Sequence, residues 1–245
     1  MKVARSIVIP AYREERFIAD TLQKVYDYLQ SLHWLSDTEV IVVTADASDE
    51  TQAITASKIR IFEHGIHVQP GPRVGKGRDV KAGLKASSGD FVLFMDADLA
   101  TPLNYIEPAF AALEQKGGMV IGTRHIHTMH KTFSRRLSSR LSNYLIRAFV
   151  GWNIIDSQCG FKGFEKKLVH ILLERSRIMG WGFDFEFIKI TRLHNMPITS
   201  IDIPDWKDPK PEGTGLAGDS QMTAMKQAFK DLLHVKKNEM KGLYK

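Results

Sequence analysis

The residues with the clearest capacity for chemistry are two aspartates, Asp96 and Asp98, at the end of the apolar segment FVLFM. They stand on a turn just before Pro102, where a helix is expected to begin. Carboxylates at this spacing can present hard oxygen ligands to Mg²⁺ or Mn²⁺. A metal held there can bridge a diphosphate and neutralise the charge that develops on a nucleoside diphosphate leaving group. The alternative for an isolated Asp-x-Asp is a solvated turn or a helix N-cap, so the neighbouring segments decide between the two.

Two further segments carry residues suited to nucleotide binding. Lys76 and Arg78 lie in the Gly-rich stretch GPRVGKGRD before an expected helix, where cations and helix amides suit a diphosphate. At the end of the first expected strand, Pro10, Tyr12 and Glu14 form a proline-shaped turn that can receive a base or a ribose. The alternatives are a surface turn around Lys76 and an ordinary strand-to-helix turn around Glu14.

The hydrophobic pattern of the chain predicts the scaffold for these residues. Short apolar runs alternate with helical periodicity, which indicates parallel strands joined by crossover helices. Runs such as VIVV and FVLF are typical of strands buried on both faces. The expected strands are 6–11, 39–43, 66–69, 90–96, 119–123, 159–164 and 198–206, and the expected helices are 15–32, 49–61, 80–86, from 102, 166–175, 183–193 and from 221. The expected fold class is α/β, with a mostly parallel central sheet flanked by helices, and such sheets bind ligands at the carboxyl ends of their strands.

Composition argues against several classes of protein. With 34 Lys and Arg against 28 Asp and Glu, the net charge of +6 is too modest and too dispersed for a dedicated nucleic-acid binder. Anionic small ligands or lipid headgroups fit this balance better. The single cysteine, Cys159, excludes an intramolecular disulfide and a Cys-rich zinc site, which favours a cytoplasmic setting. We expect Cys159 to be a small buried apolar residue.

Membrane contact is expected to be peripheral, because no run approaches the roughly 18 apolar residues of a membrane-spanning helix. Segment 134–152 has the pattern of a basic amphipathic helix, and the chain has a Lys-rich tail at 236–245. Each Lys or Arg near an anionic leaflet contributes about 1 kcal/mol, so the two segments predict reversible binding at the cytosolic face of a membrane. The alternative is a helix packed on the sheet. Segment 207–219, rich in Pro, Gly and charge, is expected to be a loop.

Seven segments, in order along nearly the whole chain, resemble those of glycosyltransferase family 2 with the GT-A fold. The resemblance is closest to the dolichyl-phosphate or polyprenyl-phosphate sugar synthase branch. The segments are IPAYREE, GKGRDVKAGLKASSGD, DAD, IGTR, DSQCGFKGF, WGFDFEF and ITSIDIPDW. The resemblance implies a catalytic domain over 1–218, with a nucleotide-sugar half at 1–123 and an acceptor half at 124–218. A basic amphipathic helix and tail would follow at 219–245.

The resemblance also implies a donor site with Mg²⁺ or Mn²⁺ as cofactor. The implied donor residues are Pro10, Tyr12 and Glu14 for the nucleotide, Lys76 for the diphosphate, and Asp96 and Asp98 for the metal. Two positions depart from the family pattern. Relatives carry a base-reading carboxylate where this chain has Thr44, with Asp46 two positions on, and some carry a further polar metal ligand where it has Ala100. Thr44 and Asp46 are therefore the candidate base contacts, and the selectivity for the base stays open.

An acceptor site built on arginines is the third implication of the resemblance. Arg124 and Arg135 would hold a lipid phosphate, which guanidinium groups can bind in bidentate fashion. Asp156 maps onto the family's acidic residue ahead of QCGFK, and WGFDFEF would bring Asp184 and Glu186 toward the pocket. Because a lipid phosphate is already ionised near pH 7, Asp156 is expected to orient rather than to accept a proton, and its alternative is to cap a turn. The residues expected at the reaction centre are Asp98, Asp156, Arg124 and Arg135.

Together, the resemblance implies an inverting, metal-dependent transfer of a hexose from a nucleotide-diphosphate sugar to a polyprenyl or dolichyl phosphate. UDP-glucose is the first donor candidate, because DADLATP is closer to glucosyl-transferring relatives, and GDP-mannose is the second. One alternative is a family 2 enzyme with a soluble or polysaccharide hydroxyl acceptor. Another is a degenerate nucleotide-sugar-binding module without activity, which the departures at Thr44 and Ala100 motivate.

Overall fold

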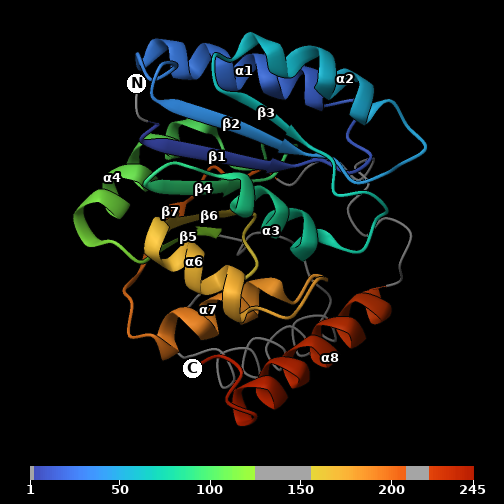
Figure 1. Ribbon diagram of the computed structural model, residues 1–245, viewed down its shortest axis with the longest axis vertical. Coiled ribbons are helices and arrows are strands. Elements are labelled where there is room, and N and C mark those ends of the chain that lie inside the picture. The colour runs from blue at the N-terminus through green and yellow to red at the C-terminus, as the bar shows by residue number, and fades with distance from the viewer. Residues whose placement is uncertain (1–2, 125–155, 208–220) are drawn as a thin grey trace.

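The computed structural model describes residues 3–124, 156–207 and 221–245, and of these the side chains of 221–229 are outside the description. Arg135, the expected amphipathic helix at 134–152 and nearly all of the expected loop at 207–219 lie outside the described residues. The described part forms a seven-stranded sheet between two layers of helices (Figure 1). This is the expected α/β architecture.

The strands follow the order β3-β2-β1-β4-β6-β5-β7 across the sheet. All neighbouring strands are parallel except at β6, which lies antiparallel between β4 and β5. The strand bounds are β1 Arg5–Pro10, β2 Thr38–Val43, β3 Gly65–Val68, β4 Phe91–Met95, β5 Met119–Arg124, β6 Phe161–Glu165 and β7 Ile198–Ile203. Because β6 runs against its neighbours, its first residue pairs with the last residue of β4. The residues just before β6 therefore lie at the edge where β4 and β5 end.

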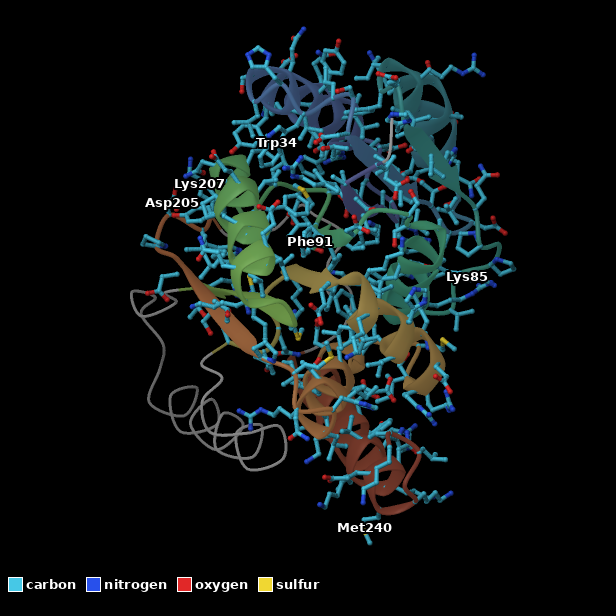
Figure 2. All side chains as sticks on the ribbon, turned by 60° about the vertical axis from the view of Figure 1, so that its left-hand side comes forward. Trp34, Lys85, Phe91, Asp205, Lys207 and Met240 are labelled. Atoms are coloured by element: carbon cyan, nitrogen blue, oxygen red, sulfur yellow. The ribbon has the colours of Figure 1, made fainter. Side chains whose placement is uncertain are left out.

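Helices cover both faces of the sheet. Their bounds are α1 Ile18–Ser31, α2 Thr51–Lys58, α3 Lys76–Ala86, α4 Ile106–Lys116, α6 Lys166–Arg175, α7 Phe183–Leu193 and α8 Gln221–Met240, with 3-10 turns η1 Ile59–Ile61 and η2 Leu103–Tyr105. Side chains of α1 and α4 form the core on one face, and those of α3, α6 and α7 form the core on the other. Leu232 and Val235 of α8 join the second core. Figures 1 and 2 show α8 at the opposite end of the molecule from α1, with Met240 at its outer end.

Successive side chains of each central strand point alternately into the two hydrophobic cores. In β1, Ile7 and Ile9 belong to the core on the α1 side, whereas Val8 belongs to the core on the α3 side. Successive strand side chains point to opposite faces, so a strand covered on both faces must be apolar throughout. The continuous run SIVIP is therefore the sequence that this buried position requires.

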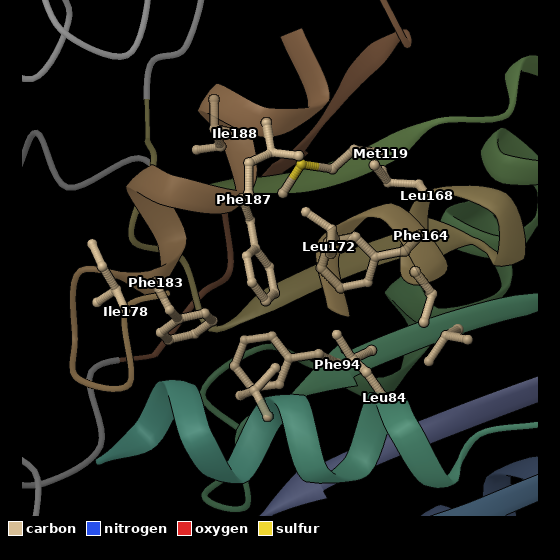
Figure 3. Close-up of a cluster of buried hydrophobic side chains, with 14 of the residues drawn as sticks. Leu84, Phe94, Met119, Phe164, Leu168, Leu172, Ile178, Phe183, Phe187 and Ile188 are labelled. Atoms are coloured by element: carbon tan, nitrogen blue, oxygen red, sulfur yellow. The ribbon is translucent and has the colours of Figure 1, made fainter. Parts of the chain in front are cut away.

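Aromatic side chains on the α3 side fix the start of α7 above the end of β4 (Figure 3). The ring centroids of Phe94 and Phe183 lie 6.0 Å apart, and those of Phe183 and Phe187 lie 5.3 Å apart, with the rings close to perpendicular. Such edge-to-face pairs stabilise a core beyond the burial of their area. Most of the aromatic content of WGFDFEF is thus core, and it anchors the residues that precede α7.

Most element bounds agree with the sequence analysis, and the differences have local causes. The helices at 166–175 and 183–193 have the expected bounds, whereas α1 begins at Ile18 rather than near residue 15. The chain before it turns through Arg13, whose φ is 60°, and residues 15–17 form a turn in which the Glu14 carbonyl oxygen accepts the amides of both Phe17 and Ile18. Within 3–124, 156–207 and 221–245, no helix has the length and apolar character needed to cross a membrane.

Candidate active site

The turn after β4 presents the two aspartates that the sequence singled out. The Ala100 amide donates to Asp98 Oδ1 at 3.0 Å, and Leu99 between them has a φ of 53°. A non-glycine residue rarely adopts this left-handed conformation, which is often found at functional sites. Burial, followed by the charge of Asp96, raises the pKa of Asp98. A cation placed near both carboxylates would favour the charged form of Asp98.

Gly160, just before β6, makes room for the side chain of Asp96. The Asp96 amide donates to the Gly160 carbonyl oxygen at 3.1 Å, and a Cβ atom added to Gly160 would lie 1.8 Å from Asp96 Oδ2. No side chain can stand at this position without moving the carboxylate. The glycine in CGF is therefore a determinant of the acid pair that the sequence analysis did not recognise.

The first prediction tests this close approach. Gly160→Ala should displace the Asp96 carboxylate and lower kcat/KM for the sugar transfer that the resemblance implies by about 100-fold, since a shift of about 1 Å in a reacting group can cost that much. Gly163→Ala on the same strand is the control, because its added Cβ would meet Leu113 Cδ1 in the core at 2.8 Å, away from the acid pair. The control should lose melting temperature without a comparable loss of kcat/KM. Equal kinetic losses in both variants would contradict the role given to Gly160.

Lys76, the first residue of α3, lies between the acid pair and an aromatic rim. Its Nζ lies 2.5 Å from Asp96 Oδ1, 5.4 Å from the centre of the Phe94 ring and 5.2 Å from the centre of the Trp181 ring. Burial opposes the ammonium charge, but the carboxylates of Asp96, Asp184 and Asp98 together outweigh it and raise the pKa of Lys76. Trp181, which is 39 % exposed, stands at the rim of the site rather than in the core. Lys76 is thus a protonated cation held between the acid pair and two aromatic rings.

Glu14 completes an acidic group around Lys76. Its amide donates to Thr51 Oγ1 at 2.8 Å, and its carbonyl oxygen accepts the amides of Phe17 and Ile18 at the start of α1. Burial, followed by the charges of Asp98 and Asp96, raises the pKa of Glu14 to about 7. The carboxyl group is therefore coupled electrostatically to the acid pair, although it lies in the turn between β1 and α1.

The second prediction follows from the sign of this shift. Folded Glu14 keeps its proton up to about pH 7, whereas an unfolded glutamate loses it near 4.5, so the folded state binds more protons in between. Stability should therefore fall as pH rises through this window, and Glu14→Gln should remove part of the fall. The expected gain in melting temperature at pH 8 is about 2–4 °C, reduced by the partial exposure of the group, with no gain at pH 4. Melting curves of both proteins across this range test it, and parallel pH profiles would contradict it.

The expected nucleotide turn is reinforced by an arginine from the Gly-rich loop. The Cζ atom of Arg73 lies 4.3 Å from the centre of the Tyr12 ring, and its guanidinium is ion-paired with the buried Asp79. Pro10 is the last residue of β1 and is half-buried. Arg78, in contrast, donates to the carbonyl oxygens of the loop itself, at Pro70 and Pro72. Arg73 is therefore a second cation near the nucleotide turn, and Arg78 shapes the loop.

The two candidate base contacts differ in exposure. Thr44 follows β2 and is fully buried, and its Oγ1 lies 2.7 Å from His67 Nε2 at the end of β3. Asp46 is exposed and accepts a hydrogen bond from Gln52 at 3.2 Å. The side chain of Thr44 thus binds its neighbouring strand, which leaves Asp46 as the member of the pair that a ligand can reach. His67, a polar residue inside the run IHVQ, was not singled out from the sequence.

Arg124 and Asp156 form a two-point ion pair at the ends of β5 and the turn before β6. Arg124 Nε lies 2.5 Å from Asp156 Oδ2, and Arg124 Nη2 donates to Asp156 Oδ1 at 2.9 Å. Burial opposes the negative charge of Asp156, but the Arg124 guanidinium, then the charge of Lys162 and the hydrogen bond from the Arg124 amide, together outweigh it and hold the pKa of Asp156 below its usual value. Arg124 Cζ also lies 5.1 Å from the centre of the Trp206 ring. Asp156 is therefore ionised, and both of its carboxylate oxygens are bound by Arg124. This arrangement suits a group that orients Arg124 and not a proton acceptor.

A fully buried cation lies beneath this pair. Lys162 of β6 has no exposed surface, and its Nζ lies 2.6 Å from Asp184 Oδ1 and also donates to the Cys159 carbonyl oxygen. Burial, only partly offset by Lys162, raises the pKa of Asp184. A lysine inside the apolar strand CGFKGF is a signal that could have been read from the sequence, because buried lysines are almost always paired. Cys159 is fully buried, as expected.

The donor atoms at this edge suit a hard divalent cation that a diphosphate completes. Mg²⁺ is commonly held by one or two carboxylates together with substrate phosphates and waters. Across the part of the chain that the structure describes, no group of three or more His, Cys, Asp or Glu side chains is placed to hold a metal by itself. Asp96 and Asp98 therefore fit a metal shared with a ligand, and they do not fit an all-protein metal cage.

The family model for glycosyl transferase family 2 matches residues 6–172, which is more than half of the chain. The chain belongs to glycosyltransferase family 2. The match begins in β1 and ends in α6, so it includes the acid pair after β4 and the turn before β6. This family membership agrees with the resemblance drawn from the seven sequence segments.

Among curated proteins, this family 2 member is similar to enzymes named for lipid phosphates. A dolichyl-phosphate beta-glucosyltransferase of Trichomonas vaginalis is 26 % identical over 83 % of this chain, and one of Drosophila melanogaster is 27 % identical over 81 %. An undecaprenyl-phosphate 4-deoxy-4-formamido-L-arabinose transferase of Proteus mirabilis is 26 % identical over 69 %. The aligned regions cover 65 %, 65 % and 51 % of the length of these relatives.

Among solved structures, this family 2 chain resembles a glucosyl-3-phosphoglycerate synthase of Mycobacterium tuberculosis. Its crystal structure with Mn²⁺, UDP-glucose and phosphoglyceric acid has a TM-score of 0.68 and 20 % identity, and it covers 95 % of this chain and 79 % of that one. The structure of the same enzyme with Mg²⁺ and UDP has a TM-score of 0.66 and 21 % identity. At this identity the likeness establishes the GT-A fold.

Proposed function

We propose that this chain transfers a hexose from a nucleotide-diphosphate sugar to a polyprenyl or dolichyl phosphate, with inversion at the anomeric carbon. One observation carries the proposal: the Lys76 and Asp96 ion pair stands at the same sheet edge as the Arg124 and Asp156 ion pair. The first pair supplies charges suited to a diphosphate with its metal, and the second supplies a guanidinium suited to a phosphate acceptor. The names of the curated relatives support a lipid phosphate as the acceptor and a sugar as the transferred group.

The donor side is assigned to the residues that surround Lys76. We assign the nucleotide to Pro10, Tyr12 and Glu14 with the exposed Asp46, the diphosphate to Lys76, and the metal to Asp96 and Asp98. A bound Mg²⁺ or Mn²⁺ would neutralise charge on the departing diphosphate. Lys76 would contribute a second positive charge to the same oxygens, since its position between Asp96 and Trp181 leaves it at the rim. UDP-glucose is the first donor candidate and GDP-mannose the second.

The acceptor side depends on Arg124. A guanidinium has five N–H donors, and among the described residues the hydrogen-bond partner of its side chain is Asp156, through Nε and Nη2, so we assign the other donors to a phosphate. A lipid phosphate is already ionised at neutral pH, so its oxygen can attack the anomeric carbon without a general base. The low pKa of Asp156 agrees with this, because Asp156 would orient Arg124 and not take a proton. The product from an α-linked donor would be a β-linked lipid-phosphate sugar.

Acceptor competition tests the proposal directly. The purified chain, Mn²⁺ and radiolabelled UDP-glucose or GDP-mannose should yield a label that partitions with polyprenyl phosphate into organic solvent. Free polyprenol, which offers a hydroxyl in place of the phosphate, should remain unlabelled. Transfer to the hydroxyl or to a soluble sugar would favour the alternative acceptor class. Donor binding without transfer or hydrolysis would favour the non-catalytic module.

The outer face of α8 is suited to an anionic membrane surface, and we propose peripheral binding there, at the cytosolic side. The exposed residues Leu233, Met240 and Leu243 alternate along this segment with the exposed lysines Lys237 and Lys241. Apolar side chains combined with lysines are typical of helices that lie in the headgroup region. The catalytic domain at 1–218 with the basic segment at 219–245 fits this arrangement.

The third prediction concerns this face. Changing both Lys237 and Lys241 to Glu should weaken binding to vesicles of phosphatidylcholine and phosphatidylserine by about 30-fold or more, because each lysine contributes about 1 kcal/mol. Changing Lys58 and Lys85 to Glu makes the same change of net charge on α2 and α3 (Lys85 is labelled in Figure 2) and should have a much smaller effect. Vesicle co-sedimentation measures both. Equal losses in the two double variants would assign the binding to overall charge instead of α8.

A further inference from the structure

The segment between α6 and α7 forms one wall of the proposed donor site. It brings Trp181 to within 5.2 Å of Lys76 Nζ, and its Met179 carbonyl oxygen accepts the Arg78 amide at 3.0 Å. The packing with the Lys76 loop is close, since a Cβ added to Gly75 would lie 2.5 Å from the Met179 oxygen. The position of Lys76 therefore depends on where residues 176–182 are held.

A buried carboxylate holds this segment in place. Glu186 of α7 has no exposed surface, and its Oε1 and Oε2 accept the amides of Arg177 and Ile178, each at 2.8 Å. The sequence resemblance placed Glu186 toward the pocket. The structure instead places its carboxylate against the backbone of the two residues that precede Met179. There it holds the wall of the site from the buried side.

The anchor is completed from the C-terminal turn. The hydroxyl of Tyr244 donates to Glu186 Oε1 at 2.7 Å, and Tyr244 is itself fully buried. Asn238 Nδ2, near the end of α8, donates to the Tyr244 hydroxyl at 3.1 Å, and His194 Nε2 lies 2.9 Å from the Tyr244 carbonyl oxygen. The turn after α8 is thus joined to the wall of the donor site through one carboxylate.

We propose that Tyr244 and Glu186 are positioning residues for donor binding, acting through the segment 176–182 on Lys76. The proposal rests on the proposed function only in taking Lys76 as the diphosphate contact. Hydrogen bonds to a charged group are among the stronger ones in proteins, so losing the Tyr244 hydroxyl should loosen the Arg177 and Ile178 amides. The face of α8 proposed to meet the membrane belongs to the same helix and turn, so the anchor also links that face to the donor site.

The test combines kinetics with hydrogen exchange on the full chain. Tyr244→Phe should raise the KM for the sugar nucleotide by about tenfold with kcat changed less than twofold, and should speed amide exchange at Arg177 and Ile178 by about tenfold. Tyr28→Phe is the control, because Tyr28 is a half-buried tyrosine of α1 on the other face of the sheet, and both readouts should stay unchanged. Asn238→Ala, a milder change at a partly exposed residue, should move both readouts in the same direction and covers the case in which Tyr244→Phe does not fold.

The outcomes separate this inference from the proposed function. Unchanged exchange at Arg177 and Ile178 in a folded variant would overturn the anchor, and so would a loss of kcat with an unchanged KM. A general rise in exchange across the core would mark Tyr244 as a residue of global stability only, which also overturns it. If the wild-type chain binds no sugar nucleotide, the proposed function fails, and the exchange measurement still decides whether the anchor exists.

Discussion

Replacing Asp96 or Asp98 by Asn should lower the rate of sugar transfer by about 10³-fold, which corresponds to about 4 kcal/mol of lost transition-state stabilisation. Asparagine keeps the shape of each side chain and removes the negative charge that would hold the metal. Asp98→Asn also keeps an oxygen for the Ala100 amide, so the turn through Leu99 is expected to persist. The loss should appear in kcat/KM and in the affinity for Mn²⁺ measured with UDP present.

The two variants should also differ from each other. Asp96→Asn leaves Lys76 without its partner at 2.5 Å, so this variant should bind the diphosphate differently as well as the metal. Asp27→Asn is the matched control, because Asp27 is an exposed aspartate of α1 that bonds to Gln23. It should retain full activity. Near wild-type rates in both site variants would remove the acid pair from the mechanism.

Replacing Arg124 by Lys should lower transfer to a lipid phosphate by about 100-fold while leaving the affinity for the sugar nucleotide within about threefold. Lysine keeps the positive charge but cannot make the fork that binds Asp156 through Nε and Nη2 and still presents further N–H groups to a phosphate. Transfer assays with saturating donor and varied polyprenyl phosphate, together with calorimetric titration of the donor, separate the two effects.

Arg60→Lys supplies the comparison for that substitution, since Arg60 is an exposed arginine of η1. It should leave transfer and donor affinity unchanged. A large loss of donor affinity in Arg124→Lys would place Arg124 on the donor side and would contradict its assignment to the acceptor. The parallel role of Arg135 stays a prediction, because Arg135 lies outside the described residues.

Much of this fold follows from patterns that are local in the sequence. Helix α6 has the expected bounds because its buried apolar residues, Leu168, Val169 and Leu172, recur at helical spacing. The direction of β6 could not be predicted in the same way, since the five residues FKGFE look alike in a parallel and an antiparallel strand. The pairing of β6 with β4 and β5 determines its direction. The same pairing brings Asp156 to the sheet edge at which Arg124 lies.

The candidate site was predictable where charge and spacing are visible in one segment. Asp96, Asp98 and Lys76 were named from their motifs, and the structure brings Lys76 and Asp96 into contact. Gly160 was missed because its function, making room for Asp96, depends on a contact between residues 64 positions apart. The burial of Thr44 against His67 depends likewise on the pairing of β2 with β3. The residue type of a side chain determines its chemistry, and the sequence shows it directly. The space around a side chain and its burial depend on residues that are distant in the chain.

The most direct test of the central claim is a crystal structure of the chain with Mn²⁺ and UDP-glucose, measured for the anomalous signal of manganese. The account predicts one peak within about 2–2.5 Å of carboxylate oxygens of Asp96 and Asp98 and of diphosphate oxygens, with Lys76 beside the same phosphates. A bound nucleotide whose diphosphate and metal lie away from both aspartates would contradict it.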